Sequence, residues 1–463
     1  MIFDIDKHNS ETIALKDDSG LIFTYGDLVR NIGSASIKLP QRSLVFILAE
    51  NTVNVITFVL KCLEHRIVPL LLNPELDSEL FKSYIDKYRP NAIFCNTKST
   101  KDIENIKEII RYSDYDLVLL ANDQIEINES LSFLLPTSGS TGSPKLVRHS
   151  LENLTFSARS VSMFFEITPN DVGLGALPCY YTMGFSVISS HLQAGATVVL
   201  TQYNLTDRNF WDILKSEKIS ILTGVPYTFD VLFKMRLERY DLPNLRIITQ
   251  GGGKLPEPIW VKLSNYADQK GIKFIPTYGQ TEGTARMAFL NANQVNEKIG
   301  SIGKPIPGGY FEIWDEKKEI INEVEAIGEL VYKGKNVTLG YAESYLDLLK
   351  GDERIGLLET GDIVKRDTDG FYFIVGRKKR FLKIFGLRIS LDEIEDLVKN
   401  NFEVDCFSTG DDSLLTVYIT DSDLTIDVKN WLVAKTKLFH QAIEIKFVVD
   451  IPRNSSGKVI FDK

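Results

Sequence analysis

Hydrophobic and polar positions follow two periods along roughly the first 300 residues. Short apolar runs that fit buried strands occur at residues 44–48, 68–72, 92–95, 131–135, 197–200, 219–223, 245–248 and 273–275. Helical periodicity occupies residues 53–65 and 76–88, between the first of these runs. Strands that alternate with helices in this way predict α/β architecture, with parallel-rich sheets covered by helices.

The pattern changes from about residue 300. Residues 310–314, 328–332 and 370–375 alternate like antiparallel strands and predict a small β-barrel-like subdomain. After a basic break, residues 390–400 predict an amphipathic helix with Ser390 at its N-cap and Glu393 three residues later. We therefore predict a large N-terminal domain, residues 1–378, and a small α+β C-terminal domain, residues 380–463, with the boundary near Lys379.

The uncharged stretch at residues 172–190 could be mistaken for a transmembrane segment. Gly173, Gly175, Pro178 and Gly184 interrupt it, so it predicts a buried strand, a turn and a helix instead. The N-terminus carries acidic residues where a signal peptide needs basic ones, and no long apolar core follows. We expect a cytoplasmic protein without a membrane span.

Composition narrows the class of protein. A chain of 463 residues predicts two or three domains, and 44% hydrophobic with 25% charged residues is typical of a soluble globular protein. The net charge of −9 argues against nucleic acid as a partner. Neither disulfides nor a metal cluster are expected, because the cysteines and histidines are scattered: Cys62, Cys95, Cys179, Cys406, His8, His65, His149, His191 and His440.

A polar loop follows the strand predicted at residues 131–135. It contains Thr137, Ser138, Gly139, Ser140, Thr141, Gly142, Ser143, Pro144 and Lys145. Glycines allow close approach of backbone N–H groups, hydroxyls donate to phosphate oxygens, and the lysine supplies charge. The loop lacks the Gly-Lys pair of a Walker loop. It is either a polyphosphate site or an ordinary surface loop.

Three other motifs could serve a nucleotide. In residues 278–282, Tyr278 and Gly279 can lie against a purine, while Thr281 and Glu282 can serve a phosphate and its Mg²⁺. Residues 360–362, Thr-Gly-Asp, precede a predicted strand and end in a carboxylate, Asp362. The third motif, residues 454–458, has the sequence Asn-Ser-Ser-Gly-Lys and lies near the C-terminus. Each of these could also be a plain turn or a frayed end.

Together and in this order, the motifs resemble those of the acyl-adenylate-forming superfamily: acyl-CoA synthetases, peptide-synthetase adenylation domains and luciferases. The resemblance implies that Glu282 holds Mg²⁺, that Thr281 touches the α-phosphate and that Tyr278 packs on adenine. It implies further that Asp362 and Arg377 bind the ribose, and that Gly251, Gly252 and Gly253 line the adenine and acyl pockets.

The same resemblance assigns roles near the C-terminus. It implies that the small C-terminal domain is mobile, with Lys379 at the hinge position. Lys383 falls where CoA ligases and luciferases use a lysine in the second half-reaction. Lys458 matches the mobile lysine that bridges the substrate carboxylate and the α-phosphate. These assignments imply catalytic roles for Lys458, Thr281, Glu282 and Lys383.

Two departures from the family pattern concern the acyl pocket. Tyr181 stands where many members carry a histidine, and Thr182 stands where domains that activate α-amino acids carry an aspartate. Without a carboxylate, an ammonium group would be buried unpaired, so an acid without an α-amine is favoured. Met183, Phe185 and Val187 are expected to line a mostly apolar pocket.

The predicted function is ATP-dependent activation of a carboxylic acid to acyl-AMP, followed by transfer to a pantetheine thiol. The expected cofactors are ATP, Mg²⁺ and either CoA or the phosphopantetheine of a free-standing carrier protein, with a slight preference for CoA. A non-catalytic nucleotide-binding protein on the same fold is the alternative from another class. A phosphotransferase is less favoured, because the chain has no Walker lysine.

Overall fold

The computed structural model describes residues 1–34, 37–136, 145–384, 387–411, 413–436, 438–453 and 459. The chain divides into two compact units. The first comprises Met1–Tyr310 and Lys333–Leu358, and the second comprises Phe311–Tyr332 and Glu359–Lys463. The predicted boundary near Lys379 lies inside the second unit, and a hinge at that residue stays a prediction.

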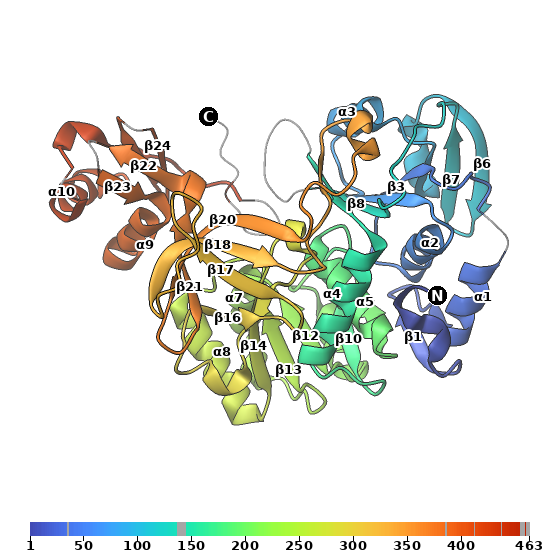
Figure 1. Cartoon of the computed structure of the whole chain (residues 1–463). Helices are drawn as coiled ribbons and strands as arrows, with labels where there is room; N and C mark the ends of the chain where they lie inside the picture. Colours follow the sequence, from blue (N-terminus) through green and yellow to red (C-terminus); the bar gives the residue numbers. More distant parts are fainter. Residues whose placement is uncertain are drawn as a thin grey trace. The chain divides into compact units, whose positions relative to one another are not determined.

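One sheet of the first unit is parallel in its centre. Its strand order is β16-β15-β14-β13-β12-β10-β11-β1-β2, and the pairs from β1 through β14 are parallel. The pairs β1–β2, β14–β15 and β15–β16 are antiparallel. The strands are β1 Ile13–Lys16, β2 Ile22–Thr24, β10 Val172–Gly175, β11 Thr197–Leu200, β12 Ile221–Gly224, β13 Ile247–Gln250, β14 Lys273–Tyr278, β15 Ala288–Phe289 and β16 Ser301–Pro305 (Figure 1).

A second sheet of this unit has the order β19-β9-β8-β4-β3-β5-β7-β6. Its pairs β3–β4, β3–β5 and β4–β8 are parallel, whereas the strands at both ends pair antiparallel. The strands are β3 Leu44–Leu48, β4 Val68–Leu72, β5 Ala92–Asn96, β6 Ile106–Tyr112, β7 Tyr115–Leu120, β8 Phe133–Pro136, β9 Leu146–His149 and β19 Gly340–Ala342. The sheet is therefore mixed, with a parallel centre.

Helices bury both faces of the second sheet. Val45 and Ile47 of β3 belong to one core with residues of both sheets and of α1, α2, α4 and α5, whereas Leu44 and Phe46 face the core beneath α3. Successive strand residues point to opposite faces, so a strand covered on both sides is continuously apolar. The helices are α1 Tyr25–Gly33, α2 Val53–Glu64, α3 Ser78–Tyr88, α4 Leu151–Phe164, α5 Thr182–Gln193, α6 Arg208–Ser216, α7 Pro226–Lys234 and α8 Glu257–Lys270.

Local signals set several helix starts. The side chain of Thr52 accepts a hydrogen bond from the Val55 amide at the start of α2, and Ser150 with Asn153 forms a reciprocal capping box at the start of α4. The helices α4 and α5 lie side by side (Figure 1). Helix α5 carries the candidate pocket residues Thr182, Met183 and Val187.

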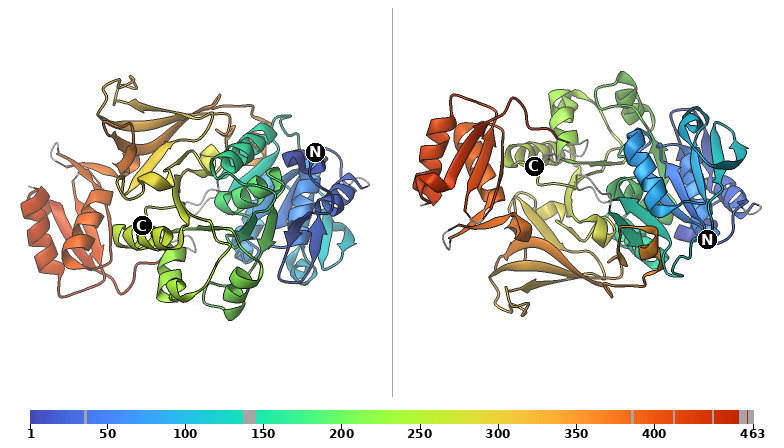
Figure 2. Two further views of the ribbon diagram at one scale, coloured as in Figure 1. Left: turned by 90° about the horizontal axis from the view of Figure 1, so that it is seen from below. Right: turned by 90° about the horizontal axis from the view of Figure 1, so that it is seen from above.

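Most of β17 Tyr310–Trp314, β18 Ala326–Lys333 and β20 Leu357–Arg366 and all of β21 Tyr372–Arg377 belong to the second unit, where the strands are adjacent in that order. Farther along, α9 Leu391–Phe402 and α10 Thr425–Thr436 share one apolar core with the strands of two small sheets (Figure 2). Those strands are β22 Phe381–Ile384, β23 Leu387–Ser390, β24 Cys406–Gly410, β25 Leu415–Ile419 and β26 Ile443–Phe447.

Most predicted elements match the structure. The uncharged stretch 172–190 forms the strand β10, a turn and most of α5, as expected. At α9 the side chain of Ser390 accepts from the Glu393 amide, so the predicted N-cap is confirmed. The hairpin of β6 and β7 was not predicted, because β6 is largely exposed and carries no buried-strand signal. All four cysteines are buried and free.

Candidate active site

A tight turn follows β14 and carries the central candidate residues. A Cβ built on Gly279 would lie 1.6 Å from the carbonyl oxygen of Ala285, so only glycine fits there. Thr284 and Ala285 adopt left-handed backbone conformations, with φ of 48° and 75°. Such conformations are rare for residues with a side chain and cluster at functional sites.

Hydrogen bonds from two other segments, α4 and residues 336–338, hold this turn. Asn336 Nδ2 donates to the carbonyl oxygen of Gly283 at 2.7 Å, and Ser157 Oγ of α4 donates to that of Thr284 at 2.7 Å. The Thr338 amide donates to the carbonyl oxygen of Glu282 at 3.0 Å. The strained conformation is thus imposed by its surroundings, which presents the side chains of Thr281 and Glu282 in a defined orientation.

Thr281 contacts the first residue of α5. Thr182 Oγ1, on the first residue of that helix, donates to Thr281 Oγ1 at 3.0 Å. Both side chains are half-buried. The structure therefore brings together the residue assigned to the α-phosphate and a residue assigned to the acyl pocket, although 99 positions separate them along the chain.

Glu282 is held by Tyr341 of β19. The Tyr341 hydroxyl donates to Glu282 Oε1 at 2.7 Å, and burial, followed by the Glu282 charge, raises the pKa of that hydroxyl. Two cations flank the tyrosine ring: Lys145 Nζ lies 4.0 Å and Arg354 Cζ 4.5 Å from its centroid. Lys145 also pairs with Glu343 at 3.1 Å. The last residue of the polar loop and the motif carboxylate thus meet at one tyrosine.

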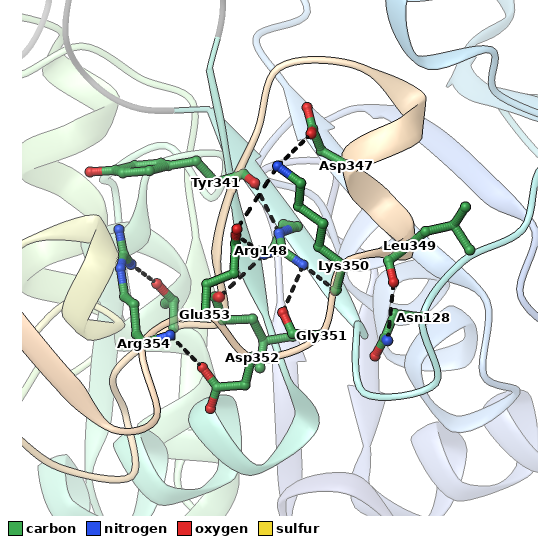
Figure 3. A network of polar contacts seen from close by, with 12 residues as sticks. Asn128, Arg148, Tyr341, Asp347, Leu349, Lys350, Gly351, Asp352, Glu353 and Arg354 are labelled. Atoms are coloured by element: carbon green, nitrogen blue, oxygen red, sulfur yellow. Dashed lines mark hydrogen bonds and ion pairs between the residues drawn. The ribbon is translucent and has the colours of Figure 1, made fainter.

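Arg148 of β9 anchors the segment that carries Tyr341 (Figure 3). Its side chain is fully buried and every N–H finds an acceptor. Nε donates to the carbonyl oxygen of Tyr341 at 3.0 Å, and Nη2 pairs with the Glu353 carboxylate. The remaining acceptors are the carbonyl oxygens of Leu339, Lys350 and Gly351. This clamp aligns β19 against β9 and thereby positions the Tyr341 ring.

The donor set fits Mg²⁺ in one specific way. Within the described ranges, no three or more histidine, cysteine or acidic side chains gather to enclose a metal ion. Mg²⁺, however, keeps several waters and is often bound through one or two carboxylates together with substrate phosphates. Glu282, oriented by Tyr341, could supply such a carboxylate.

The Gly251–Gly252–Gly253 loop lies against Met183 of α5. A Cβ built on Gly251 would lie 2.7 Å from Thr277 Oγ1 and 3.0 Å from Met183 Cε. The same methyl group lies 3.0 Å from a Cβ built on Gly252. The structure therefore brings together the glycine loop and one of the expected acyl-pocket residues, and a side chain at Gly251 or Gly252 would crowd Met183.

In the second unit, Asp362 and Arg377 are neighbours. They pair across β20 and β21, and Arg377 Nε donates to Asp362 Oδ1 at 3.1 Å. The Asp362 side chain is almost fully buried, whereas that of Arg377 is exposed. A carboxylate and a guanidinium side by side can bind ribose hydroxyls, as the resemblance implies. Their meeting with Tyr278 around one nucleotide stays a prediction.

Several predicted site residues lie outside the described residues. They are Thr137, Ser138, Gly139, Ser140, Thr141, Gly142 and Lys458. The backbone of Lys379 and Lys383 is described, but their side chains are not. The roles of all these residues stay predictions.

Sequence reasoning missed the residues that orient the motif. Tyr341, Arg354 and Asn336 lie far along the chain from Glu282 and belong to no motif that was recognised. Arg286 was missed as well, although it stands only four residues after Glu282. A basic residue in the otherwise apolar run after the turn was the available signal.

The sequence model described as "AMP-binding enzyme" matches residues 5–342. The chain belongs to this family. The predicted membership in the acyl-adenylate-forming superfamily is thereby confirmed, as is the mixed α/β fold with large sheets and several helices.

AMP-binding enzymes of assigned activity resemble the chain over most of its length. The 2-succinylbenzoate–CoA ligase of Lactococcus lactis subsp. lactis is 25% identical over 91% of this chain and 90% of its own. The 2-succinylbenzoate–CoA ligase of Bacillus cereus strain Q1 is 26% identical, over 93% of this chain and 89% of its own.

Solved structures of this family share the fold. The o-succinylbenzoate CoA synthetase of Bacillus subtilis, in complex with an acyl-adenylate intermediate, has a TM-score of 0.76 at 21% identity, with 99% of this chain and 96% of that one covered. ATP-bound MatB from Rhodopseudomonas palustris has a TM-score of 0.79 at 21% identity, with the same coverage. None of the helices in the described part of the chain has the length and apolar character needed to cross a bilayer.

Proposed function

We propose that the protein is an AMP-forming acid–thiol ligase. It activates a carboxylic acid with Mg·ATP, releases pyrophosphate and transfers the acyl group from acyl-AMP to the thiol of CoA. The observation that carries the proposal is the convergence of Thr281, Glu282, Tyr341 and Lys145 around the strained turn after β14.

In the first half-reaction, a carboxylate oxygen attacks the α-phosphorus and pyrophosphate leaves. Negative charge builds on the α-phosphoryl oxygens, and preset donors stabilise it. Thr281 contributes a hydroxyl there, and Lys458 brings its charge to both the carboxylate and the α-phosphate. Glu282 would hold Mg²⁺, which when bound would offset phosphate charge. The hydroxyl of Tyr341 fixes the orientation of the Glu282 carboxylate.

In the second half-reaction, the thiol attacks the acyl carbon and AMP leaves. We assign the change between the two reactions to rotation of the C-terminal domain, residues 380–463, about Lys379. The rotation removes Lys458 and presents Lys383. Asp362 and Arg377 keep hold of the ribose throughout, because one site that serves two chemistries needs a constant anchor and a movable part.

The 2-succinylbenzoate–CoA ligases among the relatives support CoA as the thiol acceptor. A phosphopantetheine carried by a separate protein is the alternative acceptor, and the cytoplasm is the proposed location. Direct comparison of CoA with a phosphopantetheinylated carrier protein, at equal thiol concentration, distinguishes the two acceptors.

ATP–pyrophosphate exchange across a panel of aryl, short-chain and medium-chain acids tests the proposal. We expect acid-dependent exchange, with AMP rather than ADP as the nucleotide product once thiol is added. No exchange with any acid would favour a non-catalytic nucleotide-binding protein, and ADP as the product would favour a phosphotransferase.

A further inference from the structure

Arg286 ends the turn that carries Thr281 and Glu282, and its side chain points into the protein interior. It is only 2% exposed. Its Nη1 donates to Ser186 Oγ of α5 at 2.6 Å, and its Cζ lies 5.2 Å from the ring centroid of Phe165. These neighbours are a hydroxyl and an aromatic ring, so neither balances the positive charge of the guanidinium.

The other edge of this guanidinium has no partner. Within the described residues, neither Nε nor Nη2 of Arg286 finds a hydrogen-bond acceptor, and no carboxylate forms an ion pair with it. Burial lowers the pKa of Arg286 to about 10, so the side chain still carries its charge at neutral pH. Nε and Nη2 form the edge of a guanidinium that accepts a carboxylate with two parallel hydrogen bonds.

Arg148 is a buried arginine with a structural role, and it provides a comparison for Arg286. It is also fully buried, and its N–H groups are satisfied by four backbone carbonyls and the Glu353 carboxylate. A buried charge without a partner is strongly destabilising, and each unpaired buried N–H adds to that loss. The contrast between the two arginines indicates that the partner of Arg286 comes from outside the described chain.

The position of Arg286 identifies that partner as part of the acid. Ser186 lies one helical turn after Thr182 on α5, about 6 Å farther along the axis. Thr182 contacts Thr281, beside which the reacting carboxylate is placed by the proposed function. Thr182, Ser186 and Ser189 line one small cavity together with Thr284 of the turn and residues of α4, β8 and β9. A substrate that starts at Thr281 and follows this face of α5 reaches Ser186, whose hydroxyl holds Arg286.

We propose that the acid carries a second carboxylate, which binds the Nε–Nη2 edge of Arg286 while Ser186 holds the opposite edge. The inference rests on the proposed ligase function and names its substrate class: dicarboxylic acids whose two carboxylates are separated by about one helical turn. The cavity has room for one water molecule at most, so the acid can enter only if side chains beside α5 move. This polar subsite modifies the mostly apolar pocket expected from the sequence.

Matched acids test the inference by ATP–pyrophosphate exchange with the full-length protein. Each pair differs by one carboxylate: glutarate with pentanoate, adipate with hexanoate, and 2-succinylbenzoate with 4-oxo-4-phenylbutanoate. We expect kcat/KM to favour the dicarboxylate of at least one pair by about 30-fold or more, the scale at which a buried charge pair discriminates. Exchange supported by monocarboxylates as well as or better than by their partners in every pair overturns the inference and leaves the ligase function standing.

Arg286→Met removes the charge with little change of volume. We expect it to lower kcat/KM for the preferred dicarboxylate by about 30-fold or more, chiefly through KM, and to bring the ratio within that pair close to one. Arg286→Lys keeps the charge without the bidentate edge and should retain part of the preference. Arg208→Met, at a position 91% exposed on α6, is the matched control and should change neither value.

Two outcomes distinguish failure of this inference from failure of the proposed ligase function. An Arg286→Met protein that folds but loses both members of the preferred pair equally assigns Arg286 to structure and overturns the inference. No exchange by the wild-type protein with any acid rejects the ligase function, and the inference falls with it. The wild-type ratios decide the question alone if the Met variant does not fold.

Discussion

Tyr341 joins three charged side chains of the first unit through one ring and one hydroxyl. Its hydroxyl donates a hydrogen bond to Glu282, and its ring makes cation–π contacts with Lys145 and Arg354. The side chain thus couples the motif carboxylate to the end of the polar loop. Removal of the hydroxyl alone would separate its orienting role from the packing of the ring.

Tyr341→Phe is expected to lower kcat/KM for ATP in the adenylation half-reaction by about 10–100-fold. A hydrogen bond to a charged group contributes about 1.5–3 kcal/mol, and Phe keeps the ring that packs beside Lys145 and Arg354. Pyrophosphate exchange at several Mg²⁺ concentrations measures the effect. Tyr227→Phe, at an exposed position, is the control. Unchanged exchange in Tyr341→Phe would remove Tyr341 from the site.

Lys458→Ala is expected to slow acyl-adenylate formation by roughly 10²–10³, the loss seen when one charge-stabilising donor is removed. It should leave thiol transfer from a supplied acyl-adenylate intact. Single-turnover assays of pyrophosphate release and of thioester formation measure the two steps separately. Normal pyrophosphate release would reject the role assigned to this lysine.

The turn that carries Thr281 and Glu282 was predictable from the sequence because its motif is local, whereas their roles stay predictions. Five consecutive positions carry it, and the structure places it directly after a strand, as expected. Tyr341 and Arg286 were not predictable in the same way. Tyr341 acts through a contact across 59 positions, and the orphaned charge of Arg286 exists only after folding has buried it.

At the scale of elements, the clamp from β9 to β19 depends on Arg148. Arg148→Met is expected to reduce the free energy of unfolding by about 3 kcal/mol, because several buried carbonyls lose their donor and Glu353 loses its partner. Chemical denaturation measures the loss. Arg208→Met should stay within about 0.5 kcal/mol of the wild-type protein. A loss equally small in Arg148→Met would show that the clamp contributes little.

Elements with a strong hydrophobic period were predicted well. β3 and β4 match the predicted residues because both faces of the strands are buried and every position is apolar. β12 and β13 begin two residues later than predicted, at Ile221 and Ile247, since Ile219 and Leu245 are buried without belonging to the paired strands. Burial determines which positions are apolar, whereas backbone hydrogen bonding determines where a strand begins and ends. The sequence pattern reports mainly burial.

At the scale of the whole molecule, two half-reactions are assigned to one hinge. Lys383→Ala is expected to slow thiol transfer by about 10²-fold, as for a misplaced reacting group, while adenylation changes much less. Lys379→Ala should likewise slow thiol transfer more than adenylation. Lys446→Ala, an exposed lysine of the same unit, serves as the control. Equal slowing of both half-reactions would contradict a division of labour by domain rotation.

Acid should destabilise the protein through two buried histidines. Burial lowers the pKa of His149 to about 3 and that of His191 to about 4, against 6.5 for an ordinary histidine. Below pH 6.5 the unfolded chain therefore binds protons that the folded chain does not. Stability is lost as the pH falls from about 6.5 toward 4, by up to about 1.4 kcal/mol per pH unit for each histidine.

Denaturation midpoints measured at intervals from pH 7.5 to pH 4 check this sign. His191→Gln should flatten the dependence, whereas His440→Gln, at an exposed position, should leave it unchanged. Stability that rises on acidification across this window would mean that the folded protein accepts the protons.

The four native thiols have a practical use because all are buried and free. Burial raises the pKa of Cys62, Cys95, Cys179 and Cys406, which keeps them protonated and poorly nucleophilic. A maleimide probe would therefore react with a cysteine engineered on the surface before it reached any native one. Donor and acceptor dyes could then be attached on either side of Lys379 in the otherwise unaltered chain, and a change in energy transfer between them during turnover would support the proposed rotation.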